Sequence, residues 1–149
     1  MNLKSIQPGA YAGVAGGVVF GAMLGMMGML PMIGQMAGAP SAALGFILHL
    51  AISAFIGASF AVLFQTVVNS TGSGLGYGAA YGAVWWFLGP LTLMPLMMEM
   101  GLGVNWNLTA ATAMLPSPVG HLIYGLILGF AYARLAGRSY QVQRSSATA

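Results

Sequence analysis

The sequence has little charge. Four basic side chains and a single acid, Glu99, make up 3% of the 149 residues, whereas about a quarter of the residues of soluble globular domains are charged. No formal charge occurs between Lys4 and Glu99. A soluble fold needs a charged shell around its core, so we expect most of this chain to lie in a lipid bilayer. This expectation excludes cytosolic enzymes.

Cysteine is absent, and the few basic residues are scattered. Without cysteine the chain forms neither a disulfide nor a thiolate metal site, which excludes secreted disulfide scaffolds. The formal net charge of +3 rests on Lys4, Arg134, Arg138 and Arg144. These four cations cannot form the basic surface that nucleic acid requires, so we expect no nucleic-acid partner.

Long apolar runs are what the chain has in abundance, with 58% hydrophobic residues. A membrane-crossing helix needs about 20 mostly apolar residues, and four stretches qualify, at about residues 9–33, 42–68, 75–98 and 118–135. Ser41 and Ser117 stand where helix N-caps are expected. The sequence therefore predicts an all-α transmembrane four-helix bundle in contact with the lipid bilayer.

The basic residues also predict an orientation. Lys4 precedes the first stretch, and the three arginines follow the fourth. Four crossings place both termini on one side, and the positive-inside rule makes that side cytoplasmic. We expect a multi-pass protein of the bacterial inner (cytoplasmic) membrane, with residues 137–149 as a polar cytoplasmic tail and residues 34–41 and 99–117 facing outward.

The second half of the chain repeats the first. Small residues flank a histidine at four-residue intervals in the second and fourth stretches: Gly45, His49, Ser53, Gly57 and Ala61 match Ser117, His121, Gly125, Gly129 and Ala133. In the first and third stretches Pro31 matches Pro95, and Gln35 matches Glu99. The pattern predicts one membrane domain made of two tandem parallel helix-pair repeats, at about residues 9–68 and 74–136.

Glycines recur every fourth residue in the first and third stretches: Gly9, Gly13, Gly17, Gly21 and Gly25, then Gly74, Gly78 and Gly82. In lipid, small residues allow helix backbones to approach and pack closely. The series therefore predicts a tightly packed bundle. Alternatively, these glycine-rich faces dock onto other membrane subunits.

His49 and His121 are the only histidines. An ionisable side chain inside a span indicates a functional site by default. Two matched imidazoles with small neighbours suit a flat macrocycle, either haem b or bacteriochlorophyll, and a small residue four positions before each histidine resembles the motif that presents histidine to bacteriochlorophyll in light-harvesting polypeptides. The predicted cofactor-binding residues are His49, His121, Gly45, Ser53, Gly57, Gly125 and Gly129. Alternatively, the imidazoles only join neighbouring helices by hydrogen bonds, or handle a metal ion or protons.

Most of the 12 methionines gather near the outer ends of the first and third stretches. Thioethers are soft ligands that suit Cu(I), so a second hypothesis is a copper-binding or copper-transporting protein. Its predicted metal ligands are Met27, Met32, Met97, Met98 and Glu99. Methionine is also a flexible filler of irregular apolar gaps, so packing is the simpler interpretation.

Nothing in the sequence predicts an enzyme. Glu99 is the only carboxylate, and general acid–base catalysis needs a second group. The sequence contains no Ser-His-Asp set, phosphate-binding loop or zinc-ligand cluster. We therefore expect a structural or accessory subunit of a larger membrane complex for electron transfer or photosynthesis, with soft-metal binding as the alternative.

Three short features resemble a family of small bacterial four-helix integral membrane proteins. They are the last-span segment from Gly120 to Gly129 (GHLIYGLILG), the opening from Ile6 to Ala10 (IQPGA), and the Met-Pro neighbourhoods of Pro31 and Pro95. The last-span motif, G-H-x-x-Y-G-x-x-x-G, is the specific one. The resemblance implies the four-span topology and carries no activity over to this chain.

Overall fold

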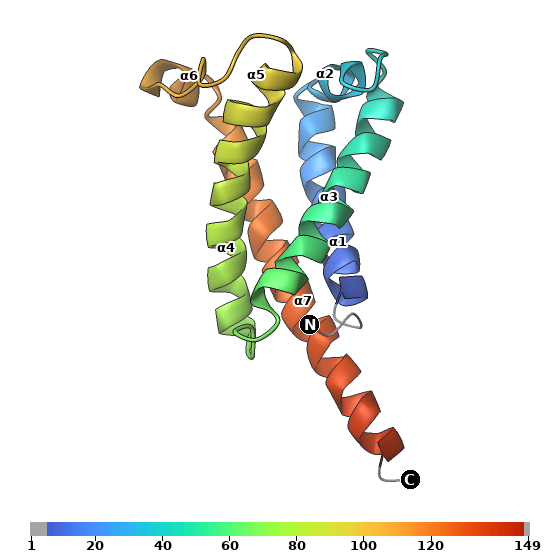
Figure 1. Ribbon diagram of the computed structural model, residues 1–149. Helices are drawn as coiled ribbons and strands as arrows, with labels where there is room; N and C mark the ends of the chain where they lie inside the picture. Colours follow the sequence, from blue (N-terminus) through green and yellow to red (C-terminus); the bar gives the residue numbers. More distant parts are fainter. Residues whose placement is uncertain (1–5, 148–149) are drawn as a thin grey trace.

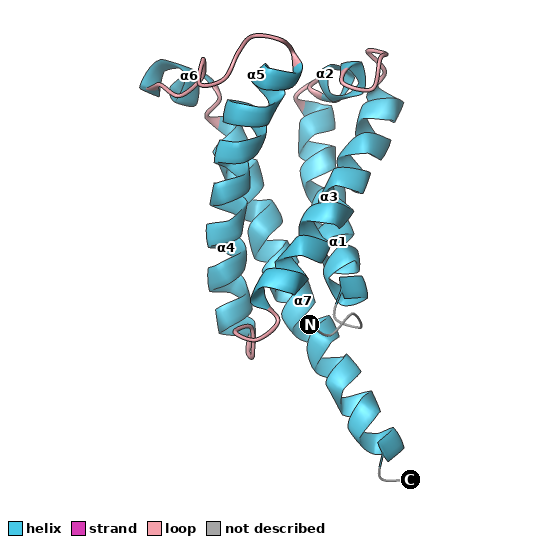
Figure 2. Ribbon diagram, viewed as in Figure 1, coloured by secondary structure: helices cyan, strands magenta, loops and turns pink. Residues whose placement is uncertain are grey.

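The structure is a computed structural model that describes residues 6–147, with side chains described through Gly137. Its regular elements in residues 6–147 are helices joined by short loops (Figures 1 and 2). Lys4, on which the predicted orientation depends in part, lies outside the described residues, and so do the side chains of Arg138 and Arg144.

Four helices dominate the fold, and their bounds are Ile6–Met26 (α1), Ala42–Phe64 (α3), Thr71–Leu88 (α4) and Pro116–Ala147 (α7). The segments Ile6–Met26, Ala42–Phe64, Thr71–Met97 and Pro116–Gly137 are each long and apolar enough to cross a membrane. The predicted all-helical, four-span architecture is confirmed at this level. The backbone of the predicted tail, residues 137–149, is not separate from the last span, because helix α7 continues to Ala147.

Shorter elements interrupt or join these helices: α2 (Leu30–Gln35), a π-helical turn (Gly89–Leu93), α5 (Met94–Met97) and α6 (Leu108–Ala113). The first predicted span is wrong at its end, because α1 stops at Met26 and Gly28 adopts a left-handed φ of 68°. The third span continues through the π-helical turn, where Pro90 provides no backbone N–H. Helix α6 was not predicted.

Side-chain capping explains where several helices begin. Ser41 accepts a hydrogen bond from the Leu44 amide at 3.3 Å, so its predicted N-cap role is confirmed. Ser70 and Ser73 form a reciprocal capping box at the start of α4. The predicted N-cap at Ser117 is wrong, because α7 already begins at Pro116.

The four long helices form two pairs, α1 with α3 and α4 with α7, and α1 also packs against α7 (Figure 1). Helices α3 and α4 are joined by the turn at residues 65–70 but make few contacts with each other. That turn, the start of α1 and the end of α7 lie at one end of the bundle, whereas α2, α5 and α6 lie at the other (Figure 1). We call the second end the α2/α5 end.

The glycine series form the contacts between the paired helices of this chain. A Cβ placed on Gly13 would lie 2.8 Å from the Cα of Gly57 in α3, and one placed on Gly78 would overlap the Gly125 carbonyl oxygen in α7. Real side chains almost never approach so closely, so these positions require glycine. Backbone-to-backbone packing of this kind replaces the hydrophobic driving force that lipid does not supply.

Aromatic side chains fill the space between the two pairs near the 65–70 turn. The Phe60 ring of α3 contacts Tyr81 of α4 at a centroid distance of 5.4 Å and Tyr132 of α7 at 5.6 Å. Tyr81 also shares a 2.8 Å hydrogen bond with Ser59. Farther along, the Tyr124 hydroxyl donates to the Ser53 carbonyl at 2.9 Å. This half of the interface between the pairs is therefore closed.

Candidate ligand cavity

The opposite half of the interface is hollow. A cavity of about 530 Å³ lies between the helix pairs toward the α2/α5 end, and side chains from α1, α2, α3, α4, α5 and α7 line it. Ile52, Phe55 and Met97 line it while being 37%, 67% and 58% exposed. The cavity therefore has a side open to the surroundings where α3 and α4 diverge, which in a bilayer is the lipid.

His49 faces this cavity from α3 and is 8% exposed. Its Nε2 lies 3.0 Å from the carbonyl oxygen of Gly17 in α1. A carbonyl only accepts hydrogen bonds, so Nε2 carries the proton. In the neutral ring Nδ1 is then unprotonated and keeps a free lone pair.

His121 faces the same cavity from α7, with the opposite tautomer. Its Nδ1 lies 2.8 Å from the Ser117 carbonyl oxygen, one turn earlier in the helix, and 3.4 Å from the Ser117 hydroxyl. Nδ1 therefore carries the proton, and Nε2 keeps the lone pair. A Cβ placed on Gly89, at the π-helical turn, would lie 3.9 Å from that Nε2. Both imidazoles thus present an unprotonated nitrogen.

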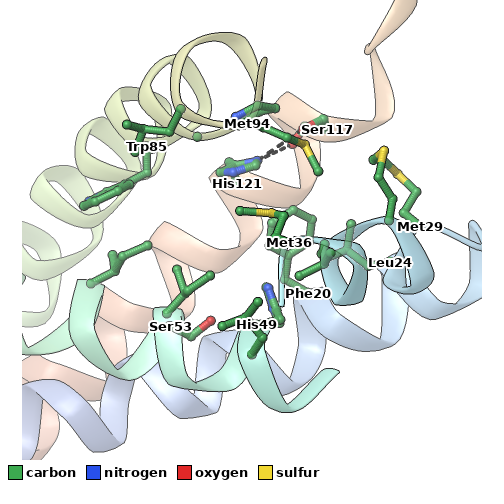
Figure 3. A pocket seen from close by; sticks show the side chains of 18 of the residues that line it. Phe20, Leu24, Met29, Met36, His49, Ser53, Trp85, Met94, Ser117 and His121 are labelled. Atoms are coloured by element: carbon green, nitrogen blue, oxygen red, sulfur yellow. Dashed lines mark hydrogen bonds between the residues drawn. The ribbon is translucent and has the colours of Figure 1, made fainter. Parts of the chain in front are cut away.

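Phe20 lies against both histidines. Its ring centroid is 5.5 Å from that of His49 and 4.7 Å from that of His121, edge-on in both cases. The ring also covers Gly120, where a Cβ would overlap it. Figure 3 shows the three rings at one wall of the cavity. A single macrocycle ligated by both imidazoles would need the space that Phe20 occupies.

Five methionines line the cavity, Met29, Met32 and Met36 from the first helix pair and Met94 and Met97 from the second. Of the predicted metal ligands, Met32 and Met97 are therefore at the cavity. Met27, Met98 and Glu99 are not among its lining residues. Met27 and Met98 are 37% and 47% exposed, and Glu99 is exposed with a left-handed φ of 58°.

Sequence reasoning did not select Met29, Met36 and Met94 as ligands. A signal was available, because Met29, Met32 and Met36 follow helical spacing, as do Met94 and Met97. The chain breaks at Gly28 just before Met29, and a π-helical turn comes just before Met94; neither is visible in that spacing.

The small residues predicted to accommodate a cofactor fall into two groups, one at the cavity and one at helix contacts. Ser53 lines the cavity. Gly45 instead abuts the Leu30 backbone, Gly57 abuts Gly9 and Gly13, and Gly125 and Gly129 abut α4. These four glycines serve helix packing and are not among the lining residues.

The nitrogen and sulfur donors at the cavity are imidazoles and thioethers, and Ser53, Ser117 and Tyr124 add hydroxyl groups. Within the part of the chain that the structure describes, no three His, Cys, Asp or Glu side chains come together as a metal-binding group. Any metal held by the cavity would therefore depend on histidine together with methionine.

Comparisons with known proteins give no relative. No protein-family model, no curated protein and no solved structure matches this chain.

Proposed function

We propose that this chain is a non-enzymatic, multi-pass membrane protein that holds a metal centre in the cavity between its helix pairs, with His49 and His121 as the two candidate imidazole ligands. One observation carries the proposal. Each imidazole donates its only N–H to a backbone carbonyl and has its other nitrogen unprotonated. Metal-binding histidines almost always donate their second ring N–H in this way, which fixes the tautomer and the ring orientation.

The two helix pairs are proposed to be tandem parallel repeats. Matching glycine contacts support this: Gly9 abuts Gly57 and Ala61 in the first pair, and Gly74 abuts Gly129 and Ala133 in the second. The repeats place His49 and His121 at equivalent positions of α3 and α7. A duplicated pair would explain why both histidines face the same cavity.

The membrane is proposed to be the bacterial inner membrane, with both termini in the cytoplasm. The positive-inside rule supports this orientation. Arg134, the one arginine whose side chain the structure describes, is exposed and stacks on Phe130 at 5.1 Å, toward the end of the bundle where α1 begins. The histidine cavity would then lie in the outer half of the bilayer.

The test is to purify the protein from membranes of cells grown with added copper and with a haem precursor, then to measure its metal content and absorption spectrum. We expect stoichiometric metal in the wild type and its loss in the His49→Asn/His121→Asn double variant. Met26→Leu, at a residue that is 82% exposed, is the control and should keep the metal. Equal metal content in all three proteins would refute the role of the histidines.

A tetrapyrrole is a second candidate for the metal centre, favoured by the size of the cavity, since about 530 Å³ exceeds what a bare ion needs. Trp85 also lines the cavity and offers an aromatic surface to a flat macrocycle. Because Phe20 separates the imidazoles, we propose one axial histidine rather than two. A Soret band lost in His121→Asn or His49→Asn would support this candidate, and colourless protein would exclude it.

A pigment-bearing protein of this kind would serve as an accessory subunit of an electron-transfer or photosynthetic complex. The glycine series pack within this chain, so contacts with other subunits would use other helix faces. Tyr11, Ile47 and Phe55 are exposed on such faces. Co-purification of large partners from native membranes would support this role, and isolation as a lone functional monomer would contradict it.

A further inference from the structure

We propose that the metal centre is a Cu(I) ion, bound by His121 Nε2 and the thioethers of Met36 and Met94, and that it bridges the two helix pairs. This inference rests on the proposed function and names the metal and its ligands. It differs from the copper site expected from sequence, which consisted of Met27, Met32, Met97, Met98 and Glu99.

The chemistry of the cavity selects a soft ion. Thioethers favour Cu(I), and imidazole binds copper readily. Mg²⁺ and Ca²⁺ need oxygen ligands, above all carboxylates, and zinc sites use three or four His, Cys, Asp or Glu ligands. The lining residues include no carboxylate and no cysteine. Ser53, Ser117 and Tyr124 contribute only neutral hydroxyl groups, so the nitrogen and sulfur donors of the lining are those of His and Met.

The electrostatics favour a monovalent ion. Burying a charge in an apolar site costs more as the charge grows, unless a counter-charge is present. Glu99 is the only acid in the chain, is exposed and is not among the lining residues. A divalent cation would bring twice the charge with nothing to neutralise it. Cu(I), held by neutral soft donors, requires the least compensation.

The three ligands come from three different elements. Met36 caps the end of α2, Met94 opens α5, and His121 lies in the second turn of α7. Met36, Met94 and His121 all line the cavity, and Figure 3 shows their side chains pointing into it. Methionine has three rotatable bonds, so its sulfur can adjust to an ion with little backbone movement.

Fixed and flexible donors complement each other at this site. His121 is held on the Ser117 carbonyl at 2.8 Å, so its Nε2 needs no reorientation to bind. Met36 follows α2, which packs against α3 of the first pair, and Met94 opens α5, which continues the third span after α4 of the second pair. A bound ion would therefore join the pairs at the end where α3 and α4 diverge.

The experiment is a Cu(I) titration of the detergent-purified full chain under anaerobic, reducing conditions, with bathocuproine disulfonate as the competing chelator. We expect one Cu(I) per chain in the wild type. The Met36→Leu/Met94→Leu double variant keeps the side-chain size but removes both sulfurs, and we expect its affinity to fall at least about tenfold. The matched control is Met27→Leu/Met98→Leu, at methionines outside the cavity, which should bind like the wild type.

The outcomes separate this inference from the proposed function. If both double variants bind Cu(I) equally, the ligand set is refuted. If the wild type binds a haem or another metal that the histidine variants do not bind, and does not bind Cu(I), the proposed function stands and this inference fails. If the wild type binds no metal centre of any kind, both fail.

A measurement on the wild type alone covers the case in which a variant does not fold. X-ray absorption of the Cu(I)-loaded protein should show a mixed sulfur and nitrogen coordination shell. A shell of nitrogen and oxygen only would overturn the assignment of Met36 and Met94.

Discussion

His49 of α3 donates its Nε2–H to the carbonyl oxygen of Gly17 in α1, at 3.0 Å. The two helices approach closely here, since a Cβ on Gly17 would lie 2.5 Å from the Ser53 hydroxyl. This close approach brings the Gly17 carbonyl within reach of the imidazole. The glycine series and the histidine cavity are therefore parts of one arrangement. Glycine packing brings α1 close enough to fix the imidazole, and the fixed imidazole presents its other nitrogen.

Helix packing through glycine is tested by Gly13→Ala. The added methyl group would lie 2.8 Å from the Cα of Gly57, so the helices must separate, and we expect destabilisation of roughly 1–3 kcal/mol. Gly76→Ala in α4 is the control because a Cβ there meets nothing within 4 Å. Alanine favours helix over glycine by roughly 0.5–1 kcal/mol, so the control should be neutral or slightly stabilised. Unfolding in detergent measures both, and equal stability of the two variants would contradict close packing at Gly13.

The nitrogen that binds the metal is tested by Gly89→Leu. The new side chain begins 3.9 Å from His121 Nε2 and would occupy the space in front of its lone pair. We expect metal binding to weaken at least about tenfold while the helical circular dichroism stays unchanged. Gly76→Leu, an exposed site in α4, serves as the control. Undiminished binding in Gly89→Leu would mean that Nε2 is not the donor.

The hydrogen bond between Tyr124 and Ser53 links α7 to α3 across the bundle, at 2.9 Å. Tyr124→Phe removes the donor and keeps the ring. Side-chain hydrogen bonds between membrane helices contribute about 0.6 kcal/mol on average, and we expect a loss of that order in the free energy of unfolding. Tyr11→Phe, at a tyrosine that is 68% exposed, should change nothing. Equal losses in both variants would show that the buried bond has no special weight.

Topology can be tested cleanly because the chain contains no cysteine. Thr66→Cys places one thiol in the turn before α4, and Leu102→Cys places one in the loop after α5. With both termini cytoplasmic, a membrane-impermeant maleimide added to intact cells with a permeable outer membrane should label the Leu102 variant, and the Thr66 variant only after lysis. The unsubstituted chain gives the background. The reverse pattern would invert the proposed orientation.

Much of the fold could be predicted from the sequence because lipid imposes simple rules. Long uncharged stretches become spanning helices, and small residues at four-residue intervals become helix contacts, as Gly13 and Gly78 do. The matching neighbourhoods of His49 and His121 indicated that both would face the interior, and both line the cavity. These are local patterns, which a single sequence records.

The rest depends on tertiary geometry that local patterns do not contain. Phe20 reaches the space between the imidazoles because α1 crosses α7 at Gly120, and no spacing in the sequence specifies that crossing. The π-helical turn at Gly89–Leu93 adds backbone to a helical turn and changes which residues face inward. Helix α5 ends at Met97, and Met94 within it lines the cavity whereas Met98 after it does not. A fixed helical period predicts neither.

The central claim, that two imidazoles with fixed and opposite tautomers offer unprotonated nitrogens to a metal, is tested most directly by ¹⁵N NMR of protein labelled at histidine. Only two residues contribute signals. We predict neutral rings protonated at Nε2 in His49 and at Nδ1 in His121, assigned with single His→Asn variants, and a shift of the unprotonated His121 nitrogen when Cu(I) or its redox-inert analogue Ag(I) is added. Charged imidazolium rings, or spectra that neither metal changes, would contradict the claim.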